Sequence, residues 1–200
     1  MADDARTRIL DATVSCLGRF GIAKTTVDDA AREAGLARAT VYRHFPDGKD
    51  QLIAEAITWA VAVFFRDLAR AVDDAPDFAT LLERALVHAH RAVDDHEVLQ
   101  KVLETEPERL LPQLSQSAPM VQASVRDYFA ERLAGERLRD GLDAAAAAEW
   151  LSRMGLSFIL AEGRWDLADP VSVRRLVREE LLVGILADPG AGAGGATASP

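Results

Sequence analysis

Apolar residues recur every three to four positions along most of this 200-residue chain, which is the period of an α-helix that buries one face. The longest such run extends from Gly48 to about Ala75, and at about 1.5 Å per residue it predicts a helix roughly 40 Å long. The other predicted helices cover residues 6–20, 26–34, 38–45, 78–94, 118–138, 144–163 and 170–187. The pattern therefore predicts an all-α fold of about nine helices.

Residues 104–120 interrupt this pattern, because they contain Pro107, Pro112 and Pro119. Proline lacks the backbone N–H that a helix interior uses, and its ring clashes with the preceding turn. We therefore predict a loop here, with one helical turn at residues 108–114.

Residues 25–49 predict two short helices that meet at a tight corner. Thr26, followed three positions later by Asp29, is a variant of the capping box with which helices begin. Gly35 can adopt the left-handed conformation just past the end of the first helix, and Pro46 stops the second helix.

The packing of such a corner requires a small residue in the first helix, a glycine in the turn and a branched apolar residue in the second helix. Ala31, Gly35 and Val41 occupy these places. The opposite face of the second helix and the residue just beyond it then carry the donors that a helix entering the DNA major groove requires: Arg38, Thr40, Tyr42, Arg43, His44 and Lys49. The alternative is an ordinary pair of amphipathic helices whose charges are solvated.

The segment TTVDDAAREAGLARATVYRHFPDGKDQL resembles, nearly position by position, the DNA-binding region of the TetR family of transcriptional repressors. The resemblance covers about the first quarter of the chain. It implies phosphate contacts for Thr25, Thr40, Tyr42, His44 and Lys49. It implies operator-dependent contacts for Arg38, Ala39 and Arg43. The predicted DNA-binding residues are Thr25, Thr26, Arg38, Ala39, Thr40, Tyr42, Arg43, His44 and Lys49.

Two positions depart from the usual pattern of that family. Ala37 stands where the family has serine, so the second helix lacks a side-chain cap, a loss of about 1 kcal/mol. Residues 46–48 make the stretch before Lys49 one residue longer than the commonest spacing. The phosphate role that the resemblance implies is therefore less firmly supported for Lys49 than for Tyr42.

The formal net charge of −9 is unevenly distributed. Residues 1–50 hold eight basic and eight acidic side chains, whereas residues 51–200 hold 15 basic and 24 acidic ones. We expect most acids of the first part, Asp28 among them, to lie outside the DNA-facing segment, so that a basic surface can coexist with an acidic body. No uncharged apolar run reaches the roughly 18 residues of a membrane span, and the N-terminus lacks a signal-peptide pattern, so we expect a cytoplasmic protein.

Candidate chemistry outside the corner is sparse. The single cysteine, Cys16, lies beside the apolar face of the first helix, which favours a buried structural thiol over a redox sensor. His88 and His90 are two positions apart and so on different helix faces, and His96 would need a partner from elsewhere, so neither a metal nor another cofactor is predicted. The sequence has no nucleophile elbow or phosphate-binding glycine loop, so an enzyme is not predicted either.

The last two predicted helices carry more apolar surface than one intramolecular core requires. Surplus apolar faces on adjacent helices indicate a subunit interface, and two such pairs related by a twofold axis make a four-helix bundle. The predicted interface residues are Trp150, Leu151, Met154, Phe158, Val173, Leu176, Val177 and Leu181. A homodimer is also what the family resemblance implies.

These features predict a three-helix DNA-binding domain in residues 1–47, a ligand-binding and dimerisation domain in residues 48–187 and a disordered tail in residues 188–200. The expected function is that of a dimeric repressor that binds a palindromic operator in double-stranded DNA and is released by a small apolar or amphipathic effector. The predicted walls of the effector pocket are Trp59, Phe64, Leu86, Leu103, Val121, Tyr128, Phe129 and Phe158. Core packing is the alternative role for each of these residues, and an activator or a ligand-independent interaction module of the same fold is the alternative function.

Overall fold

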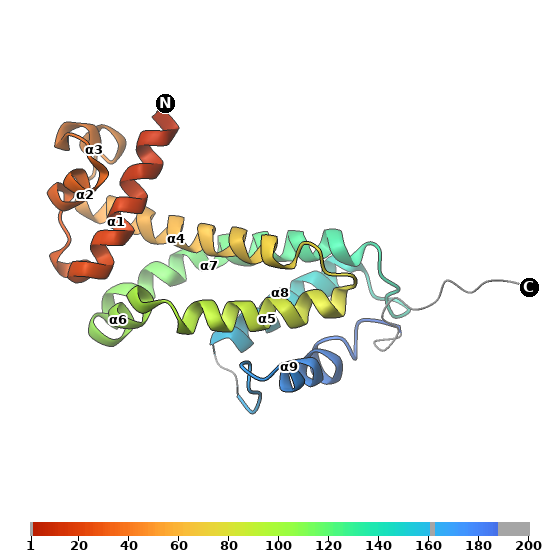
Figure 1. The fold of residues 1–200 in the computed structure, drawn as a ribbon. Coiled ribbons are helices and arrows are strands. Elements are labelled where there is room, and N and C mark those ends of the chain that lie inside the picture. The colour runs from red at the N-terminus through yellow and green to blue at the C-terminus, as the bar shows by residue number, and fades with distance from the viewer. Residues whose placement is uncertain (1, 161–162, 188–200) are drawn as a thin grey trace, which may run out of the picture. The chain divides into compact units, whose positions relative to one another are not determined.

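The computed structural model describes residues 2–160 and 163–187, most of which lie in helices (Figure 1). The α-helices are α1 (Ala2–Lys24), α2 (Val27–Ala34), α3 (Arg38–His44), α4 (Lys49–Val72), α5 (Phe78–Asp94), α6 (Glu97–Thr105), α7 (Pro107–Leu133), α8 (Ala144–Leu160) and α9 (Pro170–Leu176). A π-helical turn, η1 (Val177–Leu181), follows α9, and an isolated antiparallel bridge joins Leu138 to Leu186. The described chain is thus all-α, as the apolar pattern predicts.

The helices form two compact units. The first unit comprises the chain up to Arg66 together with Val93–Pro119, and the second comprises Asp67–Ala92 together with the described residues from Met120 onward. Helices α4, α5 and α7 contribute residues to both units. This division follows packing, while the functional boundary expected after residue 47 stays a prediction. The tail predicted for residues 188–200 lies outside the described residues.

The first unit packs α1 to α4 around a core in which alanine is the commonest residue. Small side chains allow helices to approach closely, so the backbone positions in such a core are set by direct van der Waals contact. We call this cluster the alanine core: Ile9, Leu10, Ala12, Val27, Ala30, Ala31, Ala34, Val41, Phe45, Leu52 and Ala56. A second cluster in the same unit is made of larger aliphatic side chains from α1, α4, α6 and α7: Leu17, Ile22, Ile53, Ile57, Val102 and Leu110.

Polar contacts join α6 and the residue after it to the C-terminal end of α1. The Lys101 ammonium donates to the carbonyl of Gly18 (3.0 Å), and the Glu106 carboxylate accepts from the backbone N–H of Ala23 (2.8 Å). The other carboxylate oxygen of Glu106 lies where a side chain on Gly21 would have to be placed. Gly21 also has φ 80°, a conformation that glycine adopts readily. The glycine at position 21 therefore leaves room for the Glu106 carboxylate at the end of α1.

The proline-rich segment predicted as a loop is helical, so this prediction is wrong. Pro107 begins α7, where its missing N–H has no helical partner in any case, and the helix continues through Pro112 and Pro119. These two prolines leave the carbonyls of Glu108 and Ser115 without their usual donors. Both prolines and both of those residues are exposed, so water can supply the missing hydrogen bonds. Helix α6 is a further helix, which lies outside the ranges predicted as helical.

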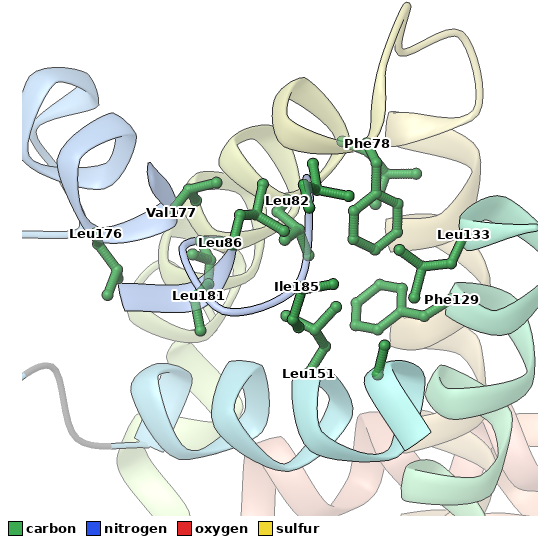
Figure 2. Close-up of a cluster of buried hydrophobic side chains, with 14 of the residues drawn as sticks. Phe78, Leu82, Leu86, Phe129, Leu133, Leu151, Leu176, Val177, Leu181 and Ile185 are labelled. Atoms are coloured by element: carbon green, nitrogen blue, oxygen red, sulfur yellow. The ribbon is translucent and has the colours of Figure 1, made fainter. Parts of the chain in front are cut away.

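The second unit has a core of larger side chains, which we call the leucine core. Its members come from the end of α4, from α5, α7, α8 and α9, from the segment before α9 and from the turns after it. In Figure 2 the labelled members from α5, α7, α8 and the C-terminal segment gather around one interior. Phe78 and Phe129 meet edge to face, with ring centroids 5.6 Å apart. The buried residues include Leu81, Leu82, Leu86, Leu133, Leu151, Leu167, Leu176, Val177, Leu181 and Ile185.

This core corrects the predicted subunit interface. Five of its residues are buried within their own chain, with at most 1% of each exposed: Leu151, Val173, Leu176, Val177 and Leu181. A side chain already enclosed by its own subunit cannot contact a second one, so these five are removed from the predicted interface. Trp150 is 42% exposed, and Met154 and Phe158 are partly buried. For these three the interface stays a prediction.

The C-terminal helix, predicted as continuous over residues 170–187, is shorter in the structure. Asp169 caps it as expected, because its carboxylate accepts from the backbone N–H of Val171 (3.0 Å), and Pro170 is the first helical residue. After α9 the backbone hydrogen bonds span five residues instead of four: the N–H of Leu182 donates to the carbonyl of Val177 (2.8 Å).

None of the described helices is both long and apolar enough to cross a membrane.

Candidate nucleic-acid interface

Helix α2 begins at the predicted capping box. The hydroxyl of Thr26 accepts from the backbone N–H of Asp29 (3.2 Å), and the Asp29 carboxylate accepts from the backbone N–H of Thr26 (3.1 Å). The carboxylate also accepts from the Thr26 hydroxyl (2.6 Å), and these bonds lower the pKa of Asp29 below its usual value. Asp29 therefore stays charged beside the positive end of the α2 dipole, which stabilises the start of the helix.

The turn between α2 and α3 follows the predicted form. Gly35 ends α2 in the left-handed conformation, with φ 64° and ψ 36°. The Arg8 guanidinium donates to the carbonyl of Ala34 (2.6 Å), which satisfies one of the free carbonyls at the end of α2. Ala37 is the N-cap residue of α3 and makes no side-chain hydrogen bond, which confirms the predicted absence of a cap.

Helix α3 is anchored along one side only. Val41 is 1% exposed and Phe45, which directly follows α3, is fully buried; both belong to the alanine core together with Ala31. The guanidinium of Arg6 covers the ring of Phe45 at 5.4 Å from its centroid. The rotation of α3 about its own axis is therefore determined by packing, and its opposite side faces solvent.

That opposite side carries the exposed residues Arg38, Ala39, Tyr42 and Arg43. Thr40, His44 and Lys49 are partly buried, and the Lys49 ammonium donates to the carbonyl of Ala23 (2.6 Å). The Nε2 atom of His44 is buried without a hydrogen-bond partner among the described residues. The structure thus places the predicted donors of α3 around one short helix.

Thr25 does not belong with these donors. Its side chain is 1% exposed, and its hydroxyl donates to the carbonyl of Gly21 (2.7 Å). A hydroxyl that is buried and already bonded cannot reach a phosphate, so the predicted contact is corrected for this side chain. Thr26, the neighbouring residue, is exposed at the start of α2.

Asp28 is a residue of this surface that the sequence analysis placed elsewhere. Its carboxylate accepts from the Arg38 guanidinium at 3.0 Å, across the corner between α2 and α3. A second nitrogen of Arg38 donates to the hydroxyl of Tyr42 (3.3 Å), one turn further along α3. The Tyr42 hydroxyl and the Asp28 carboxylate raise the pKa of Arg38, so its charge is secure. Ten residues separate Asp28 from Arg38, and only the folded corner brings them together.

Two other candidate groups, Cys16 and His96, have structural roles within the subunit. Cys16 is buried, as predicted, and burial raises the pKa of its thiol. His96 caps α6, because its Nδ1 accepts from the backbone N–H of Leu99 (3.1 Å). Across residues 2–160 and 163–187, no group of three His, Cys, Asp or Glu side chains is arranged to hold a metal ion.

The predicted effector-pocket residues are divided between the two units. Leu86 and Phe129 belong to the leucine core, with Tyr128 and Phe158 packed against it, and Val121 is buried in the same unit. The first unit holds Trp59, Phe64 and Leu103. The Trp59 indole N–H donates to Asp11 (2.7 Å). The Tyr128 hydroxyl, by contrast, is buried with no hydrogen-bond partner among the described residues, and burial raises its pKa.

Together, the capped first helix, the left-handed glycine corner and the one-sided anchoring of α3 define a helix-turn-helix protein. Residues 9–56 match the family described as bacterial regulatory proteins, tetR family. The match covers the segment that carries the helix-turn-helix, so this segment has the sequence of a tetR-family DNA-binding region.

Known relatives extend the comparison beyond that segment. The uncharacterized HTH-type transcriptional regulator Mb2274c of Mycobacterium bovis is 31% identical over 107 residues, which are 54% of this chain and 54% of the relative. The match thus spans about half the length of that curated protein. A putative TetR-family regulator from Mesorhizobium loti has a TM-score of 0.64 at 19% identity, covering 94% of this chain and 99% of its own.

The complex of SmeT with triclosan is a further structure of this fold. It has a TM-score of 0.55 at 23% identity and covers 98% of this chain and 99% of its own. SmeT is described as the repressor of the Stenotrophomonas maltophilia multidrug efflux pump SmeDEF. At these identities the likeness of the two solved structures demonstrates a shared fold.

Proposed function

We propose that the chain is a dimeric, ligand-responsive transcriptional regulator that binds double-stranded DNA and acts as a repressor at a palindromic operator. The observation that carries this proposal is the exposed face of α3, where Arg38, Tyr42 and Arg43 point away from the buried Val41 and Phe45. Donors held on a rigid, one-sided helix are what the reading of a major groove requires.

The side chains of α3 have different roles in this proposal. Arg43 is exposed and can reach base edges, for which guanidinium groups are well suited because they donate two parallel hydrogen bonds to guanine. Tyr42 contacts phosphate, which positions the helix without reading sequence. Two copies of α3 about 34–36 Å apart would enter successive major grooves of one operator.

A homodimer supplies the second copy of α3. On α8, Trp150, Met154 and Phe158 are spaced four residues apart, so they lie along one side of the helix, and Trp150 is largely exposed for an indole. We assign the subunit contact to this stripe. Sedimentation of the wild-type chain is expected to give a dimer, and Trp150→Glu is expected to shift it toward monomer. A wild-type chain that sediments as a monomer at micromolar concentration would exclude this assembly.

The proposed effector is small and apolar or amphipathic. All eight predicted pocket residues are aliphatic or aromatic, and the Tyr128 hydroxyl, which has no hydrogen-bond partner among the described residues, offers one polar contact. SmeT, which has the same fold, forms a complex with the small molecule triclosan. The test is a thermal-melt panel of hydrophobic compounds, in which a binder raises the melting temperature and weakens DNA binding. If no compound in a broad panel shifts the melt, the effector class is wrong.

The decisive experiment for DNA binding is a gel-shift titration on palindromic repeats from the DNA that flanks the coding region, at two salt concentrations. We expect Tyr42→Ala to weaken binding to all sequences alike and Arg43→Ala to change which sequence is preferred. The rival function is an interaction module that no longer recognises DNA, and it predicts weak binding without sequence preference. An activator binds in the same way, so a reporter assay with the operator at its natural position decides the direction of regulation.

A further inference from the structure

The most specific arrangement on the α3 surface is the contact between Asp28 and Arg38. One guanidinium nitrogen of Arg38 donates to the Asp28 carboxylate at 3.0 Å, and another donates to the Tyr42 hydroxyl at 3.3 Å. The guanidinium carbon also lies 5.4 Å from the centroid of the Tyr42 ring. Three contacts from two helices therefore act on a single guanidinium.

These contacts restrict where Arg38 can point. A free arginine side chain has many rotamers, and ordering it on binding costs conformational entropy. Here the orientation is already limited before DNA arrives, and the Nε–H and the remaining N–H groups of the guanidinium stay available to a further acceptor. The side chains of Arg38 and Asp28 are 60% and 51% exposed, so that acceptor can approach from solvent.

The charge of Asp28 decides which acceptor is favoured. A phosphate near Arg38 would also lie near the Asp28 carboxylate, and like charges at short distance repel. The edge of a guanine offers two neutral acceptors, O6 and N7, and bears no net charge. The pair of Asp28 and Arg38 is neutral as a whole, so it gives little of the counterion release on which phosphate binding depends. Asp28 therefore favours a base over the backbone as the partner of Arg38.

We propose that Asp28 is a positioning residue for sequence recognition, which directs Arg38 to a guanine and away from phosphate. This inference rests on the proposed DNA-binding function and extends it to a residue of α2. Without the carboxylate, Arg38 would be free to bind the nearest phosphate, as any solvated arginine does. Each subunit would then gain affinity that carries no sequence information.

The test uses the full-length protein and two matched variants, Asp28→Asn and Asp47→Asn. Both remove one exposed acid in the region of the corner and keep the shape of the side chain, but only Asp28 contacts Arg38. Base preference is measured by selection from a randomised half-site, and the salt dependence of binding is measured on the selected operator. Melting curves confirm that both variants are folded.

For the wild-type protein we expect one base pair per half-site at which G·C is preferred by about 5- to 150-fold, a preference that Arg38→Ala removes. Asp28→Asn is expected to lower that preference by about two- to fivefold, in line with an exposed ion pair. It should also steepen the plot of log affinity against log salt by up to about 0.9 per subunit, because Arg38 then spends part of its time on a phosphate. Asp28→Glu restores the carboxylate and should recover much of the preference.

Asp47→Asn is expected to raise affinity for all sequences without changing base preference. If Asp28→Asn behaves in the same way, the inference is overturned and the proposed function stands, because the acid then acts only through its charge. If the wild-type protein selects no sequence, the proposed function fails and the inference fails with it. If Arg38→Ala leaves the selected sequence intact, Arg38 does not read a base and the role of Asp28 is excluded.

Discussion

The alanine core and the leucine core both bury apolar surface between helices, but with side chains of different size. In the alanine core, Ala30 and Ala31 are almost completely buried between helices that approach closely. In the leucine core, side chains such as Leu151 and Phe129 fill the space between helices. The packing of the alanine core requires small side chains, whereas the packing of the leucine core requires large ones. We therefore expect the leucine core to be sensitive to the removal of methylene groups and the alanine core to be sensitive to their addition.

The largest effect is expected from loss of volume in the leucine core. Leu151→Ala removes a side chain that is 1% exposed and should lower the free energy of unfolding by about 2–5 kcal/mol. The control is Leu111→Ala, the same chemical change at a residue that is 52% exposed, for which a change within about 0.5 kcal/mol is expected. Urea unfolding measures both. Equal effects of the two variants would contradict the burial described for Leu151.

The next largest effect is expected from added volume in the alanine core. Ala31→Leu forces extra methylene groups between α2 and its neighbours and should destabilise the protein by about 1–3 kcal/mol, with loss of DNA binding. Ala39→Leu adds the same groups on the exposed side of α3 and should leave stability nearly unchanged. The comparison of the two cores would lose its basis if Ala31→Leu stabilised the protein.

A smaller gain is expected from repairing the uncapped start of α3. Ala37→Ser supplies a hydroxyl that can accept from a free backbone N–H, and should raise stability by about 0.5–2 kcal/mol. Ala39→Ser, inside the same helix, is the control and should be neutral or slightly destabilising. Thermal melts of the two variants against wild type decide the matter. No gain from Ala37→Ser would mean that water already serves the start of α3 equally well.

The smallest effect concerns the capping box and its dependence on pH. Hydrogen bonds from Thr26 lower the pKa of Asp29 in the folded state, so its contribution to stability is fully present above the unfolded pKa and is lost as pH falls through the folded pKa. Asp29→Asn should therefore destabilise the protein at neutral pH, and its difference from wild type should shrink in acid. Unfolding curves at pH 7 and near pH 3 test this. A difference that is constant with pH would show that the charge of Asp29 has no part in capping.

The corner was predictable because each of its local requirements is met by one residue type. Thr26 supplies a cap, Gly35 the left-handed conformation, and Pro46 a stop, and none of these depends on what lies elsewhere in the chain. The contact between Asp28 and Arg38 was not predictable in this way. It joins residues ten positions apart, and its existence depends on the angle at which two helices meet.

The errors in the larger part of the chain have a common physical cause. Periodicity shows that a face such as that of Leu176 and Leu181 is apolar, but it does not show whether the same chain or a second chain covers it. Likewise, Pro112 and Pro119 are tolerated in α7 because their side of the helix faces solvent, which is a property of the folded protein. The effector-pocket residues and the role of Trp150 stay predictions for the same reason.

The contact between Glu106 and the end of α1 offers a position at which the attachment of α6 to α1 can be adjusted. One carboxylate fills the space above Gly21 and accepts from Ala23, while Lys101 holds the neighbouring carbonyl of Gly18. None of these residues lies on α3, although the carbonyl of Ala23 also accepts from Lys49. Graded replacements of Glu106, first by glutamine and then by alanine, would therefore weaken the attachment of α6 to α1 in steps while leaving every side chain of α3 unchanged. If the chain responds to an effector as proposed, a biosensor built from it could be tuned at this single position.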